Sequence, residues 1–161
     1  VWHQAFPTIA PTVEIVTEPH AHGSGSGIIV VAQTSTGCRF AGSALGSPKT
    51  RANQVGHEAT NELLKALQDG GCVDDWLQDQ SILYMAFDGS VSELVTGSLT
   101  RHTQTAVWIA EAMSGAKFQI TKLSEGKETL HTTTRAHLYG TNGRIHGKHL
   151  IRCQGISYQN N

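Results

Sequence analysis

Three side chains in the middle of the chain have types and spacing that could perform phosphate chemistry. Asp79 follows Trp76 by one helical turn, so a helix would project the carboxylate and the indole in the same direction. A carboxylate can hold a divalent metal on a polyphosphate, and an aromatic ring can pack against a base or a ribose. His102 stands between a short predicted strand and a predicted helix start. There the helix dipole favours an anion over imidazolium, so a neutral imidazole is available as a nucleophile beside a phosphate site.

Each of these residues also has an ordinary structural interpretation. Asp79 and Trp76 fit an acidic residue next to a core tryptophan, and His102 fits a partly exposed histidine near a helix start. Spacing alone favours these interpretations, because a position at a helix start is not specific to catalysis. A functional assignment therefore depends on the wider pattern of the sequence.

Two further motifs suggest ligands but fail the specific tests. The glycine run Gly23–Gly27 lacks the Gly-Lys-Ser/Thr of a P-loop and precedes a strand rather than a helix, which favours a tight loop over a ligand loop. The histidine pairs His20 with His22 and His146 with His149 have no third partner at the usual spacing. Solvated histidines near turns are therefore favoured over a metal site.

Composition predicts a globular protein without global attraction to nucleic acid. The 161 residues include 12 Lys and Arg against 13 Asp and Glu, a formal net charge of -1, so any RNA contact must be local. The apolar runs, such as residues 28–32, are far shorter than the roughly 20 residues of a membrane helix, and we expect an intracellular protein with no membrane partner. The first residue is Val rather than Met, which fits a processed or truncated chain.

The three cysteines, Cys38, Cys72 and Cys153, are an odd number and form no C-x-x-C pair. This pattern favours buried or unused thiols over a disulfide framework or a cysteine zinc site, because free cysteine usually behaves as a small hydrophobic residue.

Strands and one helix are predicted for the first part of the chain. Residues 12–17 alternate and predict an entering strand, and residues 28–34 are apolar on both faces and predict a buried strand. Residues 38–42 can return as its antiparallel partner. A helix is predicted after Asn53 and ends at Gly70–Gly71. Its apolar residues share one face: Ala59, Leu63, Ala66 and Leu67.

A second helix and a short strand are predicted next. Asp74 and Asp75 place negative charge in the first turn of the helix, and Gly89 ends it. Its larger residues line up at helical spacing: Trp76, Gln80, Leu83, Tyr84 and Phe87. The strand covers residues 91–95.

The remaining pattern completes a layered fold. A third helix is predicted at residues 103–113, and a strand at residues 116–123. A hairpin signal at residues 141–143 precedes a last strand at residues 149–157. The predicted order is β-β-α-α-β-α-β-β. It indicates an α/β fold of α+β layers, with a mixed sheet and helices packed on one face.

Five sequence blocks, in this order along the chain, resemble the C-terminal portion of RNA 3'-terminal-phosphate cyclases, especially the animal form. The blocks are Gly23–Cys38 with Phe40–Gly46, Trp76–Gln80, Leu99–Ala106, Ala116–Phe118 and Cys153–Ile156. They keep their order and are spread over most of the length between residues 13 and 156, so chance similarity is a poor explanation.

The resemblance implies an enzyme that uses ATP to convert an RNA 3'-phosphate into a 2',3'-cyclic phosphate, through an adenylyl-histidine and an RNA-adenylate. The position matching the nucleophile is His102, within Thr100–Thr103. The metal-associated aspartate matches Asp79, and the aromatic residue that packs on the adenylate falls at Trp76, where tyrosine is more usual. The implied ATP-binding set is completed by Gln80 of the same block. The implied cofactors are ATP and Mg²⁺ or Mn²⁺, and the implied partner is an RNA 3'-phosphate end.

The resemblance also implies an organisation. Members of the family are about twice as long, and the N-terminal half that supplies further ATP and RNA contacts has no counterpart here. Residues 1–21 match the end of a small inserted domain with an entering strand, and residues 22–161 the C-terminal part of a main domain built from βαβαββ-type repeats. Residues 125–149 match poorly and predict an irregular excursion.

The expected location is the nucleoplasm or the cytosol, without secretion. The alternative function is that of a truncated, non-catalytic cyclase-like protein that binds RNA or acts in ribosome biogenesis. The presence of His102 argues for the enzyme.

Overall fold

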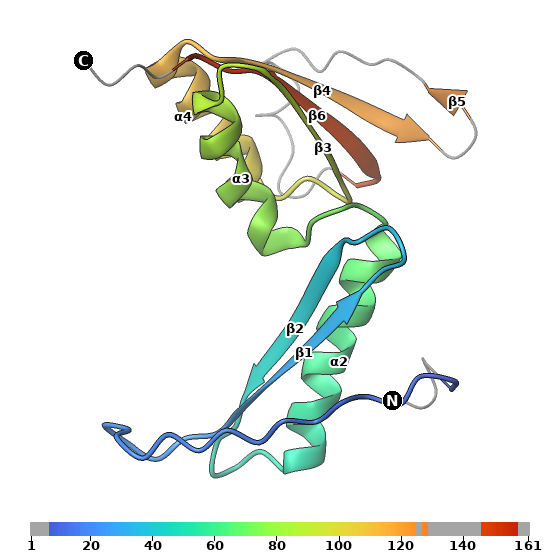
Figure 1. The fold of residues 1–161 in the computed structure, drawn as a ribbon, viewed down its shortest axis with the longest axis vertical. Coiled ribbons are helices and arrows are strands. Elements are labelled where there is room, and N and C mark those ends of the chain that lie inside the picture. The colour runs from blue at the N-terminus through green and yellow to red at the C-terminus, as the bar shows by residue number, and fades with distance from the viewer. Residues whose placement is uncertain (1–6, 125–126, 129–145, 158–161) are drawn as a thin grey trace.

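The computed structural model of the chain describes residues 7–124, 127–128 and 146–157. Two groups of elements follow one another along the chain and lie at opposite ends of the molecule (Figure 1). The first group, called here the N-terminal part, comprises β1, β2 and α2. The second group, called the C-terminal part, comprises the elements from α3 to β6.

The N-terminal part is an antiparallel strand pair covered by one helix. Strand β1 (Gly27–Gln33) pairs with β2 (Arg39–Leu45), with Gly27 opposite Leu45 and Gln33 opposite Arg39. Helix α2 (Ala52–Asp69) packs along this pair (Figure 1). The helix ends at Gly70, whose φ of 64° lies in the left-handed region that glycine adopts without steric cost.

The C-terminal part is a four-stranded antiparallel sheet with two helices on one face (Figure 1). The strand order is β3-β6-β4-β5, so the last strand of the chain lies between two earlier ones. In chain order the elements are α3 (Asp75–Phe87), β3 (Val91–Thr96), α4 (Arg101–Ser114), β4 (Lys117–Ser124), β5 (Lys127–Glu128) and β6 (Lys148–Gln154).

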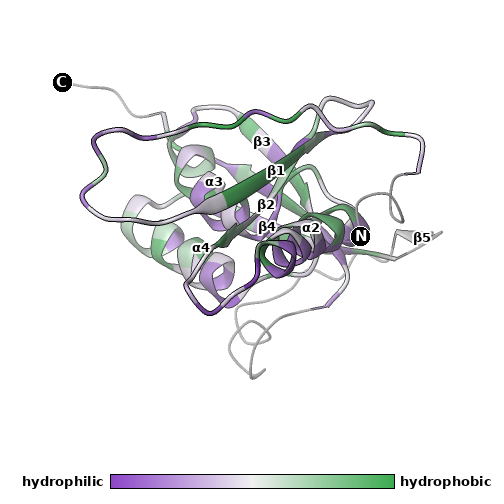
Figure 2. Cartoon of the chain, turned by 90° about the horizontal axis from the view of Figure 1, so that it is seen from below, coloured by the Kyte–Doolittle hydropathy of each residue, from purple (hydrophilic) through white to green (hydrophobic). Residues whose placement is uncertain are grey.

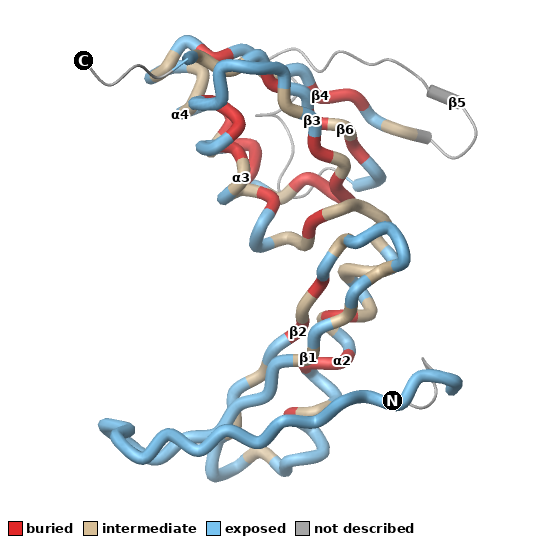
Figure 3. Tube along the Cα trace, viewed as in Figure 1, coloured by how far each residue is buried: buried red, intermediate tan, exposed pale blue. Residues whose placement is uncertain are grey.

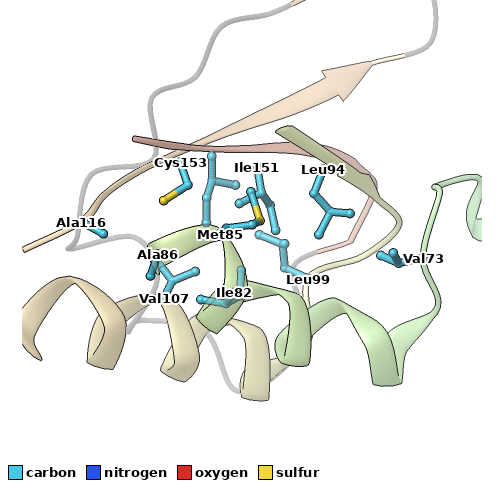
Figure 4. Packing of buried hydrophobic residues seen from close by; sticks show 11 residues of the cluster. Val73, Ile82, Met85, Ala86, Leu94, Leu99, Val107, Ala116, Ile151 and Cys153 are labelled. Carbon is cyan, nitrogen blue, oxygen red and sulfur yellow. The ribbon is translucent and has the colours of Figure 1, made fainter. Parts of the chain in front are cut away.

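The core lies between the sheet and helices α3 and α4 (Figure 4). Its buried side chains come from every layer of the C-terminal part: Val73, Ile82, Met85, Ala86, Leu94, Leu99, Val107, Ala116, Ile120, Ile151 and Cys153. All three cysteines are free, as expected, and Cys153 is fully buried. Burial raises the pKa of the Cys153 thiol to about 11, which keeps it protonated and unreactive at neutral pH.

Side-chain caps fix where the two site-bearing helices begin. The Asp74 carboxylate accepts hydrogen bonds from the backbone N–H groups of Trp76 and Leu77, at 3.1 and 2.8 Å. The Thr100 hydroxyl accepts from the backbone N–H of Thr103 at 3.1 Å. A cap of this kind stabilises a helix by about 1 kcal/mol. It therefore places Trp76 and the residues just after Thr100 in first helical turns.

The α/β class and the predicted order of elements are confirmed, with the two-residue strand β5 as an addition. The sheets differ from the prediction in one respect: every strand pair in the described residues is antiparallel, whereas a mixed sheet was expected. The predicted hairpin at residues 141–143 lies outside the described residues. The last strand ends at Gln154, three residues before the predicted end.

Two strand predictions for the N-terminal part were wrong in part. Residues 12–17 form no strand and are exposed; in the described residues β1 pairs only with β2, and this segment adds no third strand to them. Strand β1 forms as predicted but is not buried: Ile29 is 73% exposed. Figure 2 shows β1 as a hydrophobic strand, and α2 covers only one side of its two-stranded sheet.

The larger residues that line up at helical spacing in the second predicted helix do not form the buried face of α3. The aligned side chains are exposed: Trp76, Gln80, Leu83, Tyr84 and Phe87. The buried ones are Gln78, Ile82, Met85 and Ala86. Helix α4 begins at Arg101, two residues earlier than predicted. In the described part of the chain, no helix is long and apolar enough to cross a membrane.

Candidate active site at the start of helix α4

Three of the four predicted site residues line one cavity. Trp76, Asp79 and His102 all face a space of about 490 Å³ between α2, the start of α3 and the start of α4. The complete lining is Ala41, Glu62, Lys65, Ala66, Asp69, Asp74, Asp75, Trp76, Asp79, Thr100, Arg101 and His102. Gln80 is not part of this lining and is exposed on α3. Residues from both the N-terminal and the C-terminal part thus line the same cavity.

His102 is exposed in the first turn of α4. The backbone N–H groups of Thr103 and Gln104 both bond Thr100, at 3.1 Å each, one to its hydroxyl and one to its carbonyl. Within the described residues, the backbone N–H groups of Arg101 and His102 have no protein acceptor. Unpaired N–H groups at the positive end of a helix dipole favour an anion at this position.

The turn that precedes α4 is held from inside the C-terminal part by two buried side chains. Gln78 of α3 is hydrogen-bonded to both ends of the turn. The His149 ring on β6 bonds the Gly97 carbonyl through Nδ1 at 3.1 Å. Burial lowers the pKa of His149, so the ring is neutral at pH 7. Gln78 was not singled out from the sequence, and His149 was considered only as one of a histidine pair expected to be solvated, which was wrong because its ring is buried against the turn. Gln78 lies one helical turn before Ile82, so both share the buried face of α3. A polar residue at this spacing from an apolar one could have indicated a buried hydrogen-bonding role.

Trp76 is oriented by the N-terminal part of the molecule. Its indole N–H donates to Oε1 of Glu62 on α2 at 2.9 Å. The other carboxylate oxygen of Glu62 accepts from the backbone N–H of Ser43 on β2 at 2.6 Å. The Trp76 side chain is still 66% exposed, so a ring face remains open to a planar ligand. The polar tip of the tryptophan is therefore already occupied by protein.

The cavity is lined by more acidic than basic side chains. Five carboxylates and two cations face it. Asp74 caps α3, Glu62 holds Trp76, and Asp75 pairs with Lys65 at 3.3 Å. In the described part of the chain, no hydrogen bond or ion pair of protein origin engages the side chains of Asp69 or Asp79. Three cavity carboxylates thus have structural partners, and two remain available to a ligand.

No group of three or more His, Cys, Asp or Glu side chains within the described residues could hold a metal ion by itself. His20, His22 and His146 are exposed, and His149 is buried in the sheet, so the histidine pairs do not converge. The glycine run at residues 23–27 is exposed and is not part of the cavity lining. Any metal at this site would need oxygen atoms from a ligand in addition to Asp79.

Comparisons with known proteins connect this geometry to a family. The model of the insert domain of RNA 3'-terminal phosphate cyclases matches residues 1–68. A protein of Dictyostelium discoideum named probable RNA 3'-terminal phosphate cyclase is 39% identical over 136 residues, which cover 84% of this chain and 28% of the relative. The chain belongs to the RNA 3'-terminal phosphate cyclase family. Cyclases of Drosophila melanogaster and Pyrococcus abyssi are 35% and 41% identical, over 73% and 67% of the chain.

The matched part of the chain spans about a third or less of the length of these cyclases, at 28%, 33% and 31%. The insert-domain match reaches Gln68 and therefore includes β1, β2 and nearly all of α2. It extends past the boundary predicted between residues 21 and 22, and that boundary remains a prediction. One wall of the cavity, with Glu62, Lys65 and Ala66, lies within the insert match, and Trp76, Asp79 and His102 lie beyond it.

Proposed function

We propose that this protein acts in the ATP-dependent conversion of an RNA 3'-phosphate into a 2',3'-cyclic phosphate, with His102 as the nucleophile. The observation that carries the proposal is the position of His102. It lies in the first turn of α4 and shares one cavity with Asp79 and Trp76. Membership of the cyclase family supports the reaction class, which the printed names of the relatives state for those proteins.

The proposed reaction has three displacement steps at phosphorus. The neutral imidazole of His102 attacks the α-phosphorus of ATP, and the new P–N bond forms as the bond to pyrophosphate breaks. An oxygen of the RNA 3'-phosphate then attacks the same phosphorus and releases the imidazole. Finally, the adjacent 2'-hydroxyl loses its proton and attacks the RNA phosphorus, and AMP leaves. The bonds and charges balance without a redox partner.

The start of α4 supplies a complementary environment for the charge on phosphorus. We expect the open backbone N–H groups of Arg101 and His102, together with the Arg101 guanidinium, to face the phosphoryl oxygens. Because the backbone N–H groups are fixed by the capped turn before the ligand arrives, they require little reorganisation during the reaction.

Asp79 is the proposed ligand of Mg²⁺ or Mn²⁺. Mg²⁺ is commonly bound by one or two carboxylates together with substrate phosphates, and an acidic lining with an available Asp79 fits that pattern. A dedicated protein cage does not fit, because the described residues contain no three-ligand cluster. When bound, the metal ion would offset the negative charge of the polyphosphate, which the carboxylates of the cavity would otherwise repel.

Trp76 and Gln80 complete the proposed ATP site. The open ring face of Trp76 suits packing against adenine, and Gln80 would contact the nucleotide only from outside the cavity. For RNA, we expect contacts with the backbone and the 2'-hydroxyl rather than base readout. Because the relatives extend well beyond the matched span, we propose that further ATP and RNA contacts come from residues outside it. A nuclear or cytosolic place of action belongs to the same proposal.

The direct test is incubation with ATP labelled on the α-phosphate and MgCl₂ or MnCl₂, followed by mapping of any acid-labile label. We expect the label on His102 and its complete loss in His102→Ala. The matched control is His57→Ala, which removes an exposed histidine of α2 outside the cavity lining and should retain the label. Label that persists in His102→Ala would show that the nucleophile is assigned to the wrong residue.

The second candidate function is a non-catalytic cyclase-like protein that binds RNA or acts in ribosome biogenesis. A folded protein that takes up no label, but binds RNA ending in a 3'-phosphate, would support this candidate over the enzyme.

A further inference from the structure

Gln78 is a fully buried amide in the helix that carries Trp76 and Asp79. Its exposed fraction is 0%, and it lies on the face of α3 that packs against the sheet and α4. A buried amide without partners costs several kcal/mol, so such a side chain persists only where its hydrogen bonds are made. The identity of its partners therefore indicates what the residue does.

All four hydrogen-bonding positions of the Gln78 amide are used on one turn of the backbone. Its NH₂ group donates to the Thr96 hydroxyl and, at 3.3 Å, to the Ser98 carbonyl. Its Oε1 accepts from the Thr100 backbone N–H at 2.9 Å and from the Thr103 hydroxyl at 2.5 Å. The Thr100 backbone N–H can only donate a hydrogen bond, so the oxygen of the Gln78 amide, and not its NH₂ group, must face Thr100.

These bonds enclose the position of His102. Thr96 is the last residue of β3, Thr100 is the N-cap of α4, and Thr103 is the residue after His102. The Thr100 and Thr103 hydroxyls are also bonded to each other, at 2.9 Å. Gln78 therefore connects the end of a strand, the cap and the first turn of the helix through one side chain. The His102 side chain is exposed, and among the residues that the structure describes none holds it by a hydrogen bond of this kind.

We propose that Gln78 is a positioning residue, which fixes the turn from Thr96 to Thr103 so that His102 and the open N–H groups of α4 face the nucleotide cavity. This inference rests on the proposed function of His102. An imidazole that attacks phosphorus must be held close to its reactive geometry, and a misplacement of about 1 Å can reduce a rate roughly 100-fold. Because Gln78 acts through the backbone, it needs no contact with ATP.

Two substitutions separate the functions of the amide. Gln78→Met keeps the length of the side chain and removes all four hydrogen bonds. Gln78→Glu keeps two oxygen acceptors for Thr100 and Thr103 but loses the NH₂ donor. The matched control is Gln119→Met, which makes the same chemical change on the exposed side of β4 in the same part of the molecule. Circular dichroism confirms that each variant is folded at the temperature used.

The first measurement is independent of activity. In ¹⁵N NMR, hydrogen exchange at the Thr100 amide should be at least about 10-fold faster in Gln78→Met than in the wild type, because its buried acceptor is gone. The His102 ring resonances should shift or broaden in the same variant. Gln78→Glu should retain slow exchange at Thr100, and Gln119→Met should match the wild type. Unchanged exchange and unchanged His102 resonances in folded Gln78→Met would overturn the proposal.

The second measurement is the rate of label transfer from ATP to the protein. At saturating ATP we expect a fall of about 10- to 100-fold in Gln78→Met, with the half-saturating ATP concentration changed less than about 3-fold, since geometry rather than binding is lost. Gln78→Glu should recover part of the rate. A wild-type rate in folded Gln78→Met would overturn the positioning role.

The two measurements also distinguish failures. If the wild-type protein takes no label, the proposed function fails, and the exchange and ring spectra still decide whether Gln78 fixes the turn. If Gln78→Met does not fold, Gln78→Glu decides: slow exchange at Thr100 with a reduced labelling rate supports the proposal. Fast exchange at Thr100 with a full labelling rate contradicts it.

Discussion

The N-terminal and C-terminal parts of the molecule differ sharply in how they bury apolar side chains. Every member of the main core cluster lies after α2: Val73 in the connection to α3, and all the others in the C-terminal part. The buried apolar residues of the N-terminal part are Phe40, Val55, Ala59 and Leu63. Figure 3 shows the contrast, with buried segments gathered around α3, α4 and the sheet, and mostly exposed backbone around β1 and the segment before it.

The two parts of the molecule therefore contribute different features to the candidate site. The C-terminal part has enough packed surroundings to hold a buried polar network, and this network fixes the start of α4 near His102. The N-terminal part contributes a wall, through exposed bonds such as that between Glu62 and Trp76. The position of His102 therefore depends on the better-packed part, and the orientation of Trp76 on the less-packed one. The following substitutions test this contrast in order of decreasing effect.

The largest effect is expected from a cavity in the main core. Ile151 on β6 is fully buried, with 0% exposure, and Ile151→Ala should lower the free energy of unfolding by about 2–5 kcal/mol. Val31→Ala removes a β-branched side chain from β1 that is 60% exposed, and should change stability by less than about 0.5 kcal/mol. Urea denaturation monitored by circular dichroism measures both values. Equal losses would show that the two parts share one core.

The next effect is expected where α2 meets β2. A Cβ at Gly42 would meet the backbone carbonyl oxygen of Ala59 and lie 2.5 Å from the backbone nitrogen of Leu63. Gly42→Ala should therefore destabilise the N-terminal part by about 1–3 kcal/mol. Gly56→Ala, in a helical position with open space, should instead stabilise the protein by up to about 1 kcal/mol. Hydrogen exchange along β1 and along β6 shows whether the loss stays in the N-terminal part. Equal behaviour of the two alanine variants would contradict the close packing.

A smaller effect is expected from pH. Burial lowers the pKa of His149 below its ordinary value of 6.5, so the unfolded chain takes up the proton at a higher pH than the folded chain. The folded state is therefore most stable, as far as His149 is concerned, above about pH 6.5, where the ring is neutral in both states. This contribution to the free energy of unfolding is lost as the pH falls toward the folded-state pKa of His149. Urea midpoints between pH 8 and pH 5 should fall in the wild type and fall less in His149→Gln. Parallel curves for the two proteins would contradict a neutral buried His149.

The smallest effect is expected from the ion pair between the two parts. Lys65 and Asp75 are 3.3 Å apart, with side chains 55% and 35% exposed, so solvent and salt screen their attraction. Lys65→Met should change the free energy of unfolding by less than about 1 kcal/mol, and the difference should vanish at 1 M NaCl. A larger, salt-independent loss would mean that the interface between the parts is a true core.

Local signals predicted much of the architecture. Gly70 and Asp74 were sufficient to predict the end of α2 and the start of α3, because a left-handed glycine and a capping carboxylate act on neighbouring backbone groups. The alternating and apolar runs predicted β1 and β3, since strand propensity is carried by the residues themselves. The same reasoning failed for residues 12–17, where the pattern is right but no neighbouring strand accepts the pairing.

The candidate site could be predicted only in part. Trp76 and Asp79 were placed on one helix face by their spacing, and the cavity confirms that they lie together with His102. Gln80 stands one residue from Asp79 in the sequence, yet it is absent from the lining because adjacent helical residues point about 100° apart. Gln78 shows no motif at all, since its role lies entirely in partners far along the chain.

The sequence by itself determined the order of helices and strands, the glycine end of α2, the acidic start of α3, and the resemblance that identifies His102 and Asp79 as candidates. The tertiary structure alone decided which face of α3 is buried, that α2 forms a wall of the cavity, and that Gln78 controls the turn before His102. The reason is the range of the forces involved. Caps and propensities act within one helical turn. The bonds that shape the site join residues 14 apart, from Glu62 to Trp76, and 22 to 25 apart, from Gln78 to Thr100 and Thr103, so only the folded chain brings them together.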